Sequence, residues 1–335
     1  MKIAIVRLSA LGDIVHSMIV LQFIKREFPQ SRITWITQSG FTELLEKNPH
    51  IDEIVGIDPK KIKKRPLLAV EYAKKLRNLG EFDKIVDLQG LLKSALICRI
   101  LKGKRYGLEF GSAREWEAAL LYEERITVFC EKNVIYRNLD MVSKVFGFEY
   151  TKSEVLNKKP LLYFNIEGTE HLKTYFKERE NVLIVPGSSQ KNKNYPPQKM
   201  AEVAKAFKNP LIIWGNESEK KIAKQIASAS RATVLPKLSF NQLKYVISRS
   251  DMVIGGDTGP THMAWAMNRP SVVLFGYTPT SLMFQTEINA AVKSPSPAGK
   301  CRFDKNDDSI KLIKPETVIE KAKEILERQT LSMAL

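Results

Sequence analysis

The feature that most constrains this chain is an alternation, in both of its halves, of short β-rich runs with helical segments. The runs expected to be strands are 2–6, 33–37, 54–57 and 84–88 in the first half, and 182–185, 211–214, 233–235, 252–254 and 272–275 in the second. Helical patterns lie between these runs. Such an alternation predicts an α/β fold in which parallel sheets carry helices on both faces.

The length of 335 residues is enough for two domains that each have a core of their own. The pattern loosens from residue 138 to about residue 180, so we expect domains 1–165 and 166–335. A last helix, expected at 315–328, could pack on either domain. Two α/β domains in tandem, with no repeat of 20–50 residues, suggest an enzyme with a cleft between them.

The charge balance is unusual, because 53 Lys and Arg residues against 37 Asp and Glu residues give a formal net charge of +16. This excess suits a polyanionic partner, either nucleic acid or an acidic membrane surface. A basic enzyme with no such partner is the simpler alternative. The sequence shows no helix-turn-helix, RNA-binding or zinc motif, which counts against a nucleic-acid-binding protein.

Cysteine spacing and hydropathy bear on the compartment. Cys98, Cys130 and Cys301 are far apart and predict neither a disulfide framework nor a zinc site. The hydrophobic N-terminal run is interrupted by charged or polar residues such as Arg7 and Asp13, so it fits neither a membrane span nor a signal peptide. We therefore expect a cytoplasmic protein whose membrane contact is peripheral.

The stretch DMVIGGDTGPTHMAWAM, residues 251–267, carries the fullest set of candidate site residues. An apolar run stops at Gly255-Gly256, and a helix pattern starts at Pro260. The residues that follow the first two glycines are Asp257, Thr258, Gly259 and, on the helix, His262. Free N–H groups at such a helix start can bind an anion. Helix capping by Asp257 or Thr258 explains part of the pattern, but three glycines and a histidine in one turn favour a phosphate site.

Two other loops of the second half follow predicted strands. Gly187-Ser188-Ser189 leads toward Lys191 and Lys193 and offers backbone, hydroxyl and ammonium donors to a diphosphate. Its spacing is not that of a P-loop. In the second loop, Glu217 or Glu219 could bind ribose hydroxyls, or Asn216 and Ser218 could simply cap the next helix.

The loop Arg7-Leu8-Ser9-Ala10-Leu11-Gly12-Asp13 follows the first predicted strand and has no dinucleotide fingerprint. Ligands of open α/β sheets bind beyond the carboxyl ends of strands, so this loop belongs to a candidate site. From chemistry alone, the simpler role of Asp13 is to cap the helix that follows. The functional alternative is a carboxylate that takes a proton from a substrate hydroxyl. His16 is expected in the core.

Further anion-binding candidates lie in the first half. The run Lys60-Lys61-Ile62-Lys63-Lys64-Arg65 is either solvated surface, which is the default, or a site for an anionic substrate group. Asp87-Leu88-Gln89-Gly90 with Lys93 and Ser94 has the form of an anion-receptive helix start, unless Gly90 only eases the turn. Arg114 offers one more guanidinium for a carboxylate or phosphate.

Taken together, these residues resemble the lipopolysaccharide heptosyltransferases, and within them the heptosyltransferase I group. The resemblance covers nearly the whole chain. Its most specific stretches are SALGDIVHS (9–17), DLQGLLKSA (87–95), SAREW (112–116), KNYP (193–196) and GGDTGPTHMAWA (255–266). The resemblance implies the GT-B fold, in which two Rossmann-like α/β/α domains face a central cleft. It places the acceptor on the N-terminal domain and the nucleotide-sugar on the C-terminal domain.

The activity implied by the resemblance is inverting, metal-independent transfer of L-glycero-D-manno-heptose from ADP-heptose to the Kdo of Kdo-lipid A, in inner-core synthesis. No cofactor and no nucleic acid are implied, and we expect a monomer at the cytoplasmic face of the inner membrane. The alternatives are heptosyltransferase II or another GT-B nucleotide-sugar enzyme, such as an epimerase. A basic nucleic-acid-binding protein is the alternative from a different class.

The resemblance also implies roles for individual residues. Asp13 matches the general base. The donor-binding residues implied are Ser188, Ser189 and Lys193 at the diphosphate, Glu219 at the nucleoside, Asp257 at the heptose hydroxyls, and Thr258, Gly259 and His262 at the phosphate. The acceptor-binding residues expected are Lys60, Lys61, Lys63, Lys64, Gln89, Gly90, Lys93 and Arg114. No metal ligand is expected.

Overall fold

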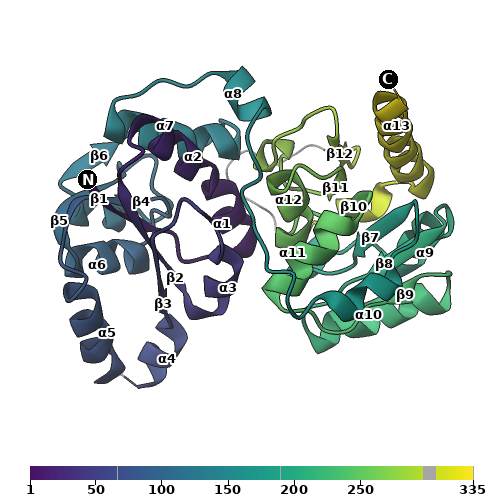
Figure 1. The fold of residues 1–335 in the computed structure, drawn as a ribbon, viewed down its shortest axis with the longest axis horizontal. Coiled ribbons are helices and arrows are strands. Elements are labelled where there is room, and N and C mark those ends of the chain that lie inside the picture. Colours follow the sequence, from purple (N-terminus) through teal and green to yellow (C-terminus); the bar gives the residue numbers. More distant parts are fainter. Residues whose placement is uncertain (66, 189, 297–306, 335) are drawn as a thin grey trace. The chain divides into compact units, whose positions relative to one another are not determined.

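The computed structural model describes residues 1–65, 67–188, 190–296 and 307–334. The chain divides into two compact units, residues 1–161 and 162–335, and the junction predicted near residue 165 lies close to this division. In the described residues each unit holds one six-stranded parallel sheet (Figure 1). The predicted α/β class with parallel sheets is therefore confirmed.

The strands of the first unit are β1 (Lys2–Val6), β2 (Arg32–Gln38), β3 (Glu53–Ile57), β4 (Glu81–Asp87), β5 (Lys102–Leu108) and β6 (Glu124–Ile126). Their order in the sheet is β3-β2-β1-β4-β5-β6. The helices are α1 (Leu11–Ser17), α2 (Ile19–Glu27), α3 (Thr42–Leu45), α4 (Pro59–Lys64), α5 (Leu67–Arg77), α6 (Leu92–Ile100), α7 (Val134–Phe146) and α8 (Lys152–Leu156), with the 3-10 turns η1 (Ser39–Phe41) and η2 (Trp116–Leu121).

Several elements of the first unit were not predicted, namely the strands β5 and β6 and the helices α4, α7 and α8. The first half of β5 is only partly buried and carries three basic residues, and β6 has two exposed charged residues, which hid their strand patterns. Helix α7 was placed in a region of loosened pattern, yet its apolar side is buried against the rest of the unit. The expected loss of regular structure from residue 138 onward is therefore wrong for the rest of α7 and for α8.

The strands of the second unit are β7 (Asn181–Val185), β8 (Asn209–Ile212), β9 (Thr233–Val234), β10 (Met252–Gly256), β11 (Ser271–Phe275) and β12 (Asn289–Lys293), in the order β12-β11-β10-β7-β8-β9. The helices are α9 (Pro197–Lys205), α10 (Glu217–Ser228), α11 (Phe240–Arg249), α12 (Gly259–Ala266) and α13 (Pro315–Ala334), with the 3-10 turns η3 (Glu170–Tyr175), η4 (Lys191–Lys193), η5 (Thr280–Leu282) and η6 (Ser309–Leu312). Strand β12 was not predicted.

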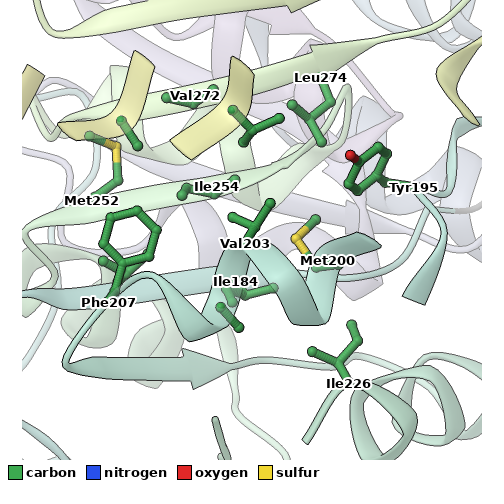
Figure 2. Packing of buried hydrophobic residues seen from close by; sticks show 14 of the residues in the cluster. Ile184, Tyr195, Met200, Val203, Phe207, Ile226, Met252, Ile254, Val272 and Leu274 are labelled. Carbon is green, nitrogen blue, oxygen red and sulfur yellow. The ribbon is translucent and has the colours of Figure 1, made fainter. Parts of the chain in front are cut away.

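The core of the second unit forms where helices cover its sheet. Ile184, Ile254 and Val272 project from neighbouring strands toward Met200 and Val203 of α9 (Figure 2). Helix α13 adds Val318, Ala322 and Ile325 to the same core. The last helix therefore packs within the second unit, one of the two alternatives that its sequence left open.

Both sheets reverse their winding direction once. In the first unit the chain leaves β1 toward β2 on one side and later adds β4 on the other, and β7 with β8 and β10 repeats this arrangement in the second unit. This is the strand order of Rossmann-like sheets, which bind ligands beyond the carboxyl ends of the strands at the point of reversal. The loops after β1, β4, β7 and β10 are therefore where sites are expected.

Three further expectations concern membrane-spanning helices, the cysteines and His16. Within the described residues, no helix is long and apolar enough to cross a membrane. Cys98 is a buried free thiol, but Cys130 is disulfide-bonded, which the cysteine spacing did not predict. His16 is buried, as expected of a core residue.

Candidate functional site

In the first unit, the loops after β1 and β4 meet through Ser9. Its Oγ lies 3.4 Å from Gln89 Nε2 and 3.3 Å from Lys93 Nζ. Gln89 Oε1 accepts the backbone N–H of Leu8 at 2.7 Å. Two candidate segments predicted at separate places in the sequence are thus brought together at the reversal point of the sheet.

Asp13 lies in the first turn of α1, beside this pair of loops. Its Oδ2 accepts the N–H of Ala10 at 3.1 Å, and its Oδ1 lies 3.2 Å from Arg7 Nη2. The helix therefore starts two residues before Asp13, with Ala10 at the N-cap, and Asp13 caps it from the third helical position rather than from the N-cap position that its sequence suggested. The side chain is still 44% exposed, so one side of the carboxylate remains open to a ligand. Capping and proton acceptance are compatible in this geometry, because the cap fixes the carboxylate without enclosing it.

Two arginines near Asp13 received no role from the sequence. Arg7 donates to the carbonyl of Leu88 as well as to Asp13. Burial lowers the pKa of Arg137, on α7, and the charge of Arg7 lowers it further, whereas Asp13 opposes the shift. Within the described residues, the Nε atoms of Arg7 and Arg137 are buried without a hydrogen-bond partner. Two guanidiniums near one carboxylate make this region receptive to an anionic group.

Asp87 holds the β4 loop in shape. Its buried carboxylate accepts N–H groups from Gln89 at 2.7 Å and Gly90 at 3.2 Å, and the hydroxyl of Tyr122 at 2.7 Å. Burial raises the pKa of Asp87, and these hydrogen bonds oppose the rise. Gly90 has a φ of 66°, and a Cβ there would lie 2.9 Å from Leu108 Cδ1. Gly90 is therefore explained by the turn, which was the simpler of its two interpretations.

The remaining predicted acceptor residues lie on neighbouring segments. Arg114 is exposed in the loop after β5, which is tied to the β4 loop by the N–H of Glu115 donating to Gly90 O at 3.3 Å. Lys61 and Lys64 are exposed on α4, which follows β3. Strand β2 separates β3 from β1, so α4 starts two strands away from Asp13's strand. The side chains of Lys60 and Lys63 lie outside the described part of the structure.

In the second unit, Asp257 lies directly beyond β10 and is buried. Its two oxygens have different partners, Lys193 Nζ at 2.5 Å from Oδ2 and His262 Nε2 at 2.8 Å from Oδ1. Burial alone would raise the pKa of Asp257, but hydrogen bonds and charge from His262 and Lys193 hold it well below its ordinary value. The three residues form one fixed unit, made from the loop after β7, the loop after β10 and helix α12.

The glycines of this turn are explained in part by packing. A Cβ on Gly255 would lie 2.6 Å from Val185 Cβ, and one on Gly256 would lie 2.8 Å from Lys193 O. These two glycines allow β7 and the Lys193 backbone to approach β10 closely. The argument that three glycines indicate phosphate binding is therefore corrected, because only Gly259 stands at the helix start itself.

The start of α12 remains suited to an anion. Thr258 occupies the N-cap position, but its side chain makes no capping hydrogen bond in the structure described, and its Oγ1 lies 3.4 Å from Thr261 Oγ1. The expected cap by Thr258 is therefore wrong. The N–H of Gly259 belongs to the first turn, where backbone donors have no partner within the helix. Such donors and the helix dipole favour a negatively charged ligand.

Glu219 lies beside the loop after β7. A Cβ on Gly187 would lie 2.3 Å from Glu219 Cγ, so the glycine makes room for this side chain next to Ser188. Glu219 accepts the N–H of Gly215 at 2.7 Å. Glu217, in contrast, is exposed and lies 3.7 Å from Lys220. The structure thus places Glu219, rather than Glu217, at the carboxyl edge of the sheet. Ser189 is outside the described residues.

The second unit therefore combines a lysine, a buried carboxylate, a histidine and a helix start at one reversal point. These groups suit a ligand that carries both phosphate and hydroxyl groups. Across the residues that the structure describes, no group of three or more His, Cys, Asp or Glu side chains could hold a metal ion.

Two Rossmann-like domains, with a half-exposed carboxylate at one reversal point and an anion-receptive helix start at the other, have the organisation of GT-B glycosyltransferases. The family model for Glycosyltransferase family 9 (heptosyltransferase) matches residues 70–303. The chain belongs to this family, which confirms the resemblance seen in its sequence.

Individual relatives support the same family assignment. The chain is 33% identical to lipopolysaccharide heptosyltransferase 1 of Campylobacter coli, over 97% of this chain and 99% of that protein. It is 23% identical to lipopolysaccharide heptosyltransferase 1 of Escherichia coli strain K12, over 84% and 90% of the two chains. The solved structure of E. coli heptosyltransferase WaaC with ADP matches with a TM-score of 0.79 at 20% identity, covering 97% of this chain and all of that one. The predicted GT-B fold is confirmed.

Proposed function

We propose that this protein transfers L-glycero-D-manno-heptose from ADP-heptose to the Kdo of Kdo-lipid A, as the first heptose of the lipopolysaccharide inner core. The observation that carries the proposal is the Lys193–Asp257–His262 cluster beside the start of α12. Similarity to a heptosyltransferase 1 along nearly the full length of both chains supports the choice of acceptor.

In the proposed donor site, α12 and Lys193 face the diphosphate. The ammonium of Lys193 has three N–H donors, so it can bind a phosphate oxygen while it keeps its ion pair with Asp257. Asp257 is held ionised, and we assign it to the hydroxyls of the heptose. His262 fixes the second oxygen of Asp257 and so sets the direction of the carboxylate. Glu219, beside Gly187 and Ser188, is assigned to the nucleoside.

The proposed reaction is a direct displacement with inversion. A Kdo hydroxyl attacks the anomeric carbon of ADP-heptose and gives its proton to Asp13, while the bond from that carbon to the phosphate oxygen breaks and ADP leaves. Charge develops on the departing phosphate, where Lys193 and the N–H groups of α12 stabilise it. A positioned general base contributes about 10²–10⁴-fold to such a step. No step requires a metal ion or a cofactor.

In the acceptor site we assign Gln89, Gly90, Lys93 and Arg114 to binding, together with the α4 lysines Lys60, Lys61, Lys63 and Lys64. Ser9 joins Gln89 and Lys93 next to Asp13. Arg7 and Arg137 add two positive charges there. Since the Kdo sugar is acidic, this clustering of cations around the base supports an acidic sugar as acceptor.

The experiment that tests the proposal is transfer from ADP-heptose to two acceptors, Kdo-lipid A and the same glycolipid already carrying one heptose. We expect product only with the first acceptor. Product only with the second would instead identify the enzyme that adds the second heptose. Consumption of the nucleotide-sugar without any acceptor would indicate an epimerase or hydrolase, so a no-acceptor reaction is the control. Loss of signal in a Lys193→Ala variant ties the activity to the proposed site.

A further inference from the structure

Helices α4 and α5 expose apolar and basic side chains together. Leu67 is 82% exposed and Val70 is 55% exposed, and Leu67 is the most exposed large apolar side chain among the described residues. On the opposite side of α5, Leu76 is buried and Tyr72 packs against the core of the first unit. The outward apolar residues are therefore not needed to attach α5 to the unit.

The large exposed side chains of α5 share one side of the helix. Leu67, Val70 and Lys74 stand at positions i, i+3 and i+7 of this face. The exposed Glu71, at i+4, lies among them as its one acidic residue. Lys75 is also exposed, one position further on. Lysines one or two turns away from exposed apolar residues can extend along an interface while their ammonium groups remain in water.

The sequence from residue 59 to residue 77, which forms α4 and α5, is also strongly basic. Between residues 59 and 77 the only acidic residue is Glu71. The basic residues of the same range are Lys60, Lys61, Lys63, Lys64, Arg65, Lys74, Lys75 and Arg77. A surface with this balance attracts a polyanion. Nucleic acid would use these cations but has no use for two exposed aliphatic side chains, whereas a bilayer interface accommodates both.

We propose that the surface formed by Leu67, Val70, Lys74 and Lys75, here called the α5 face, docks the enzyme on a bilayer that carries acidic lipid headgroups. The two aliphatic side chains enter the interface, and the lysines contact the headgroups. The docking proposal rests on the proposed function, because the proposed acceptor, Kdo-lipid A, is itself embedded in a membrane. The docking contact is separate from acceptor recognition, because the bilayer lipids need not be the substrate.

The test measures binding of the full chain to sedimented lipid vesicles that contain no glycolipid acceptor. The probes are vesicles of phosphatidylcholine with or without about 30% phosphatidylglycerol. We expect binding to the acidic vesicles that weakens as salt is raised. Leu67→Ser/Val70→Ser should lower the partition coefficient by more than about tenfold. Lys74→Gln/Lys75→Gln should lower it by about fivefold for each cation removed.

Matched controls separate this surface from general effects. Lys221→Gln/Lys224→Gln, on exposed positions of α10, removes the same net charge, and Leu331→Ser removes another exposed leucine of 68% exposure. Neither control should change the partition coefficient. A Leu67→Trp variant supplies an independent signal, because its fluorescence should shift to the blue when acidic vesicles are added.

Activity assays connect docking to the reaction. With a water-soluble, deacylated acceptor, Leu67→Ser/Val70→Ser should work as well as the unaltered enzyme, and with acceptor in vesicles it should be slower. Failure of the unaltered chain to bind acidic vesicles, or equal binding by the α5-face variants, would overturn the proposal. So would equal loss of activity on the deacylated acceptor, because the face would then serve the acceptor site. If no transferase activity exists at all, the vesicle results still decide the docking proposal.

Discussion

Asp13 is the residue on which the proposed chemistry depends most directly. Asp13→Asn keeps the size of the side chain and an oxygen that can accept the Ala10 N–H, but it removes the proton acceptor. We expect kcat to fall by about 10²–10⁴-fold, the usual contribution of a general base. Binding of ADP-heptose, measured by calorimetry, should not change.

The control for Asp13 is Glu149→Gln, which neutralises an exposed carboxylate elsewhere in the first unit. It should leave both kcat and donor binding unaltered. Near-normal turnover in Asp13→Asn would show that Asp13 only caps α1, which was the simpler interpretation of the sequence.

Asp257 supports a prediction on stability and pH. Because its partners lower the pKa of Asp257 in the folded protein, the ionised form stabilises the fold. That stabilisation is complete above the unfolded-state pKa of about 3.9 and is lost as the pH falls below it. Asp257→Asn should therefore cost about 3 kcal/mol at pH 7, as for other broken buried ion pairs.

The measurement is the Tm of both proteins between pH 3 and pH 7. The difference between them should be constant from pH 7 to about pH 5 and should narrow below about pH 4. A difference that stays constant down to pH 3 would mean that the carboxylate gains nothing from Lys193 and His262. The variant should also bind ADP-heptose more weakly, since Lys193 is no longer held in place.

At the scale of elements, the approach of η4 to β10 determines where Lys193 lies. Gly256→Ala places a Cβ 2.8 Å from the Lys193 carbonyl oxygen, so the loop after β7 must move away. We expect a raised KM for ADP-heptose with little change in the KM for the acceptor, read from steady-state kinetics. Gly40→Ala is the control, because a Cβ at Gly40 meets nothing within 4 Å. Unchanged donor kinetics in Gly256→Ala would show that the loop adapts without cost.

Strand–helix alternation predicted most of the elements, and the failures have physical causes. Buried strands such as β7 and β10 are continuous apolar runs and were found. Strand β6 is a three-residue edge strand with two exposed charged residues, and β12 is a short edge strand with alanines, so neither stands out by hydrophobicity. The helical pattern expected between the first two predicted strands forms two helices, α1 and α2, that meet at Met18.

The candidate site was predictable where it follows strands and less so elsewhere. Loops beyond the carboxyl ends of parallel strands are expected to meet, which is why Ser9, Gln89 and Lys93 come together. The ion pair of Lys193 with Asp257 joins residues 64 positions apart, and no local sequence pattern predicts that these two side chains meet. Arg137 was missed because it lies on α7, far along the chain from the motifs that mark Asp13.

At the scale of the whole molecule, each unit has its own sheet and its own core. The core around Ile184 and Val203 draws on residues of the second unit, including those of α13. A fragment of residues 162–335 should therefore fold alone and bind ADP-heptose, but it should transfer nothing because it lacks Asp13. Circular dichroism and calorimetry check both expectations. A fragment that is folded yet does not bind the donor would contradict the assignment of the donor site.

The shared strand order of the two sheets has a consequence for how this enzyme can change over generations. Each unit has its own winding reversal, the place where sheets of this kind bind ligands, so a substitution at one reversal need not alter the side chains at the other. If the acceptor and the donor are divided between the two units as proposed, selection can change the choice of acceptor without changing how the donor is bound. Proteins of this family would then diverge through substitutions in one unit at a time. Hybrids that combine the first unit of one relative with the second unit of another should keep the ligand preference that each unit had in its parent.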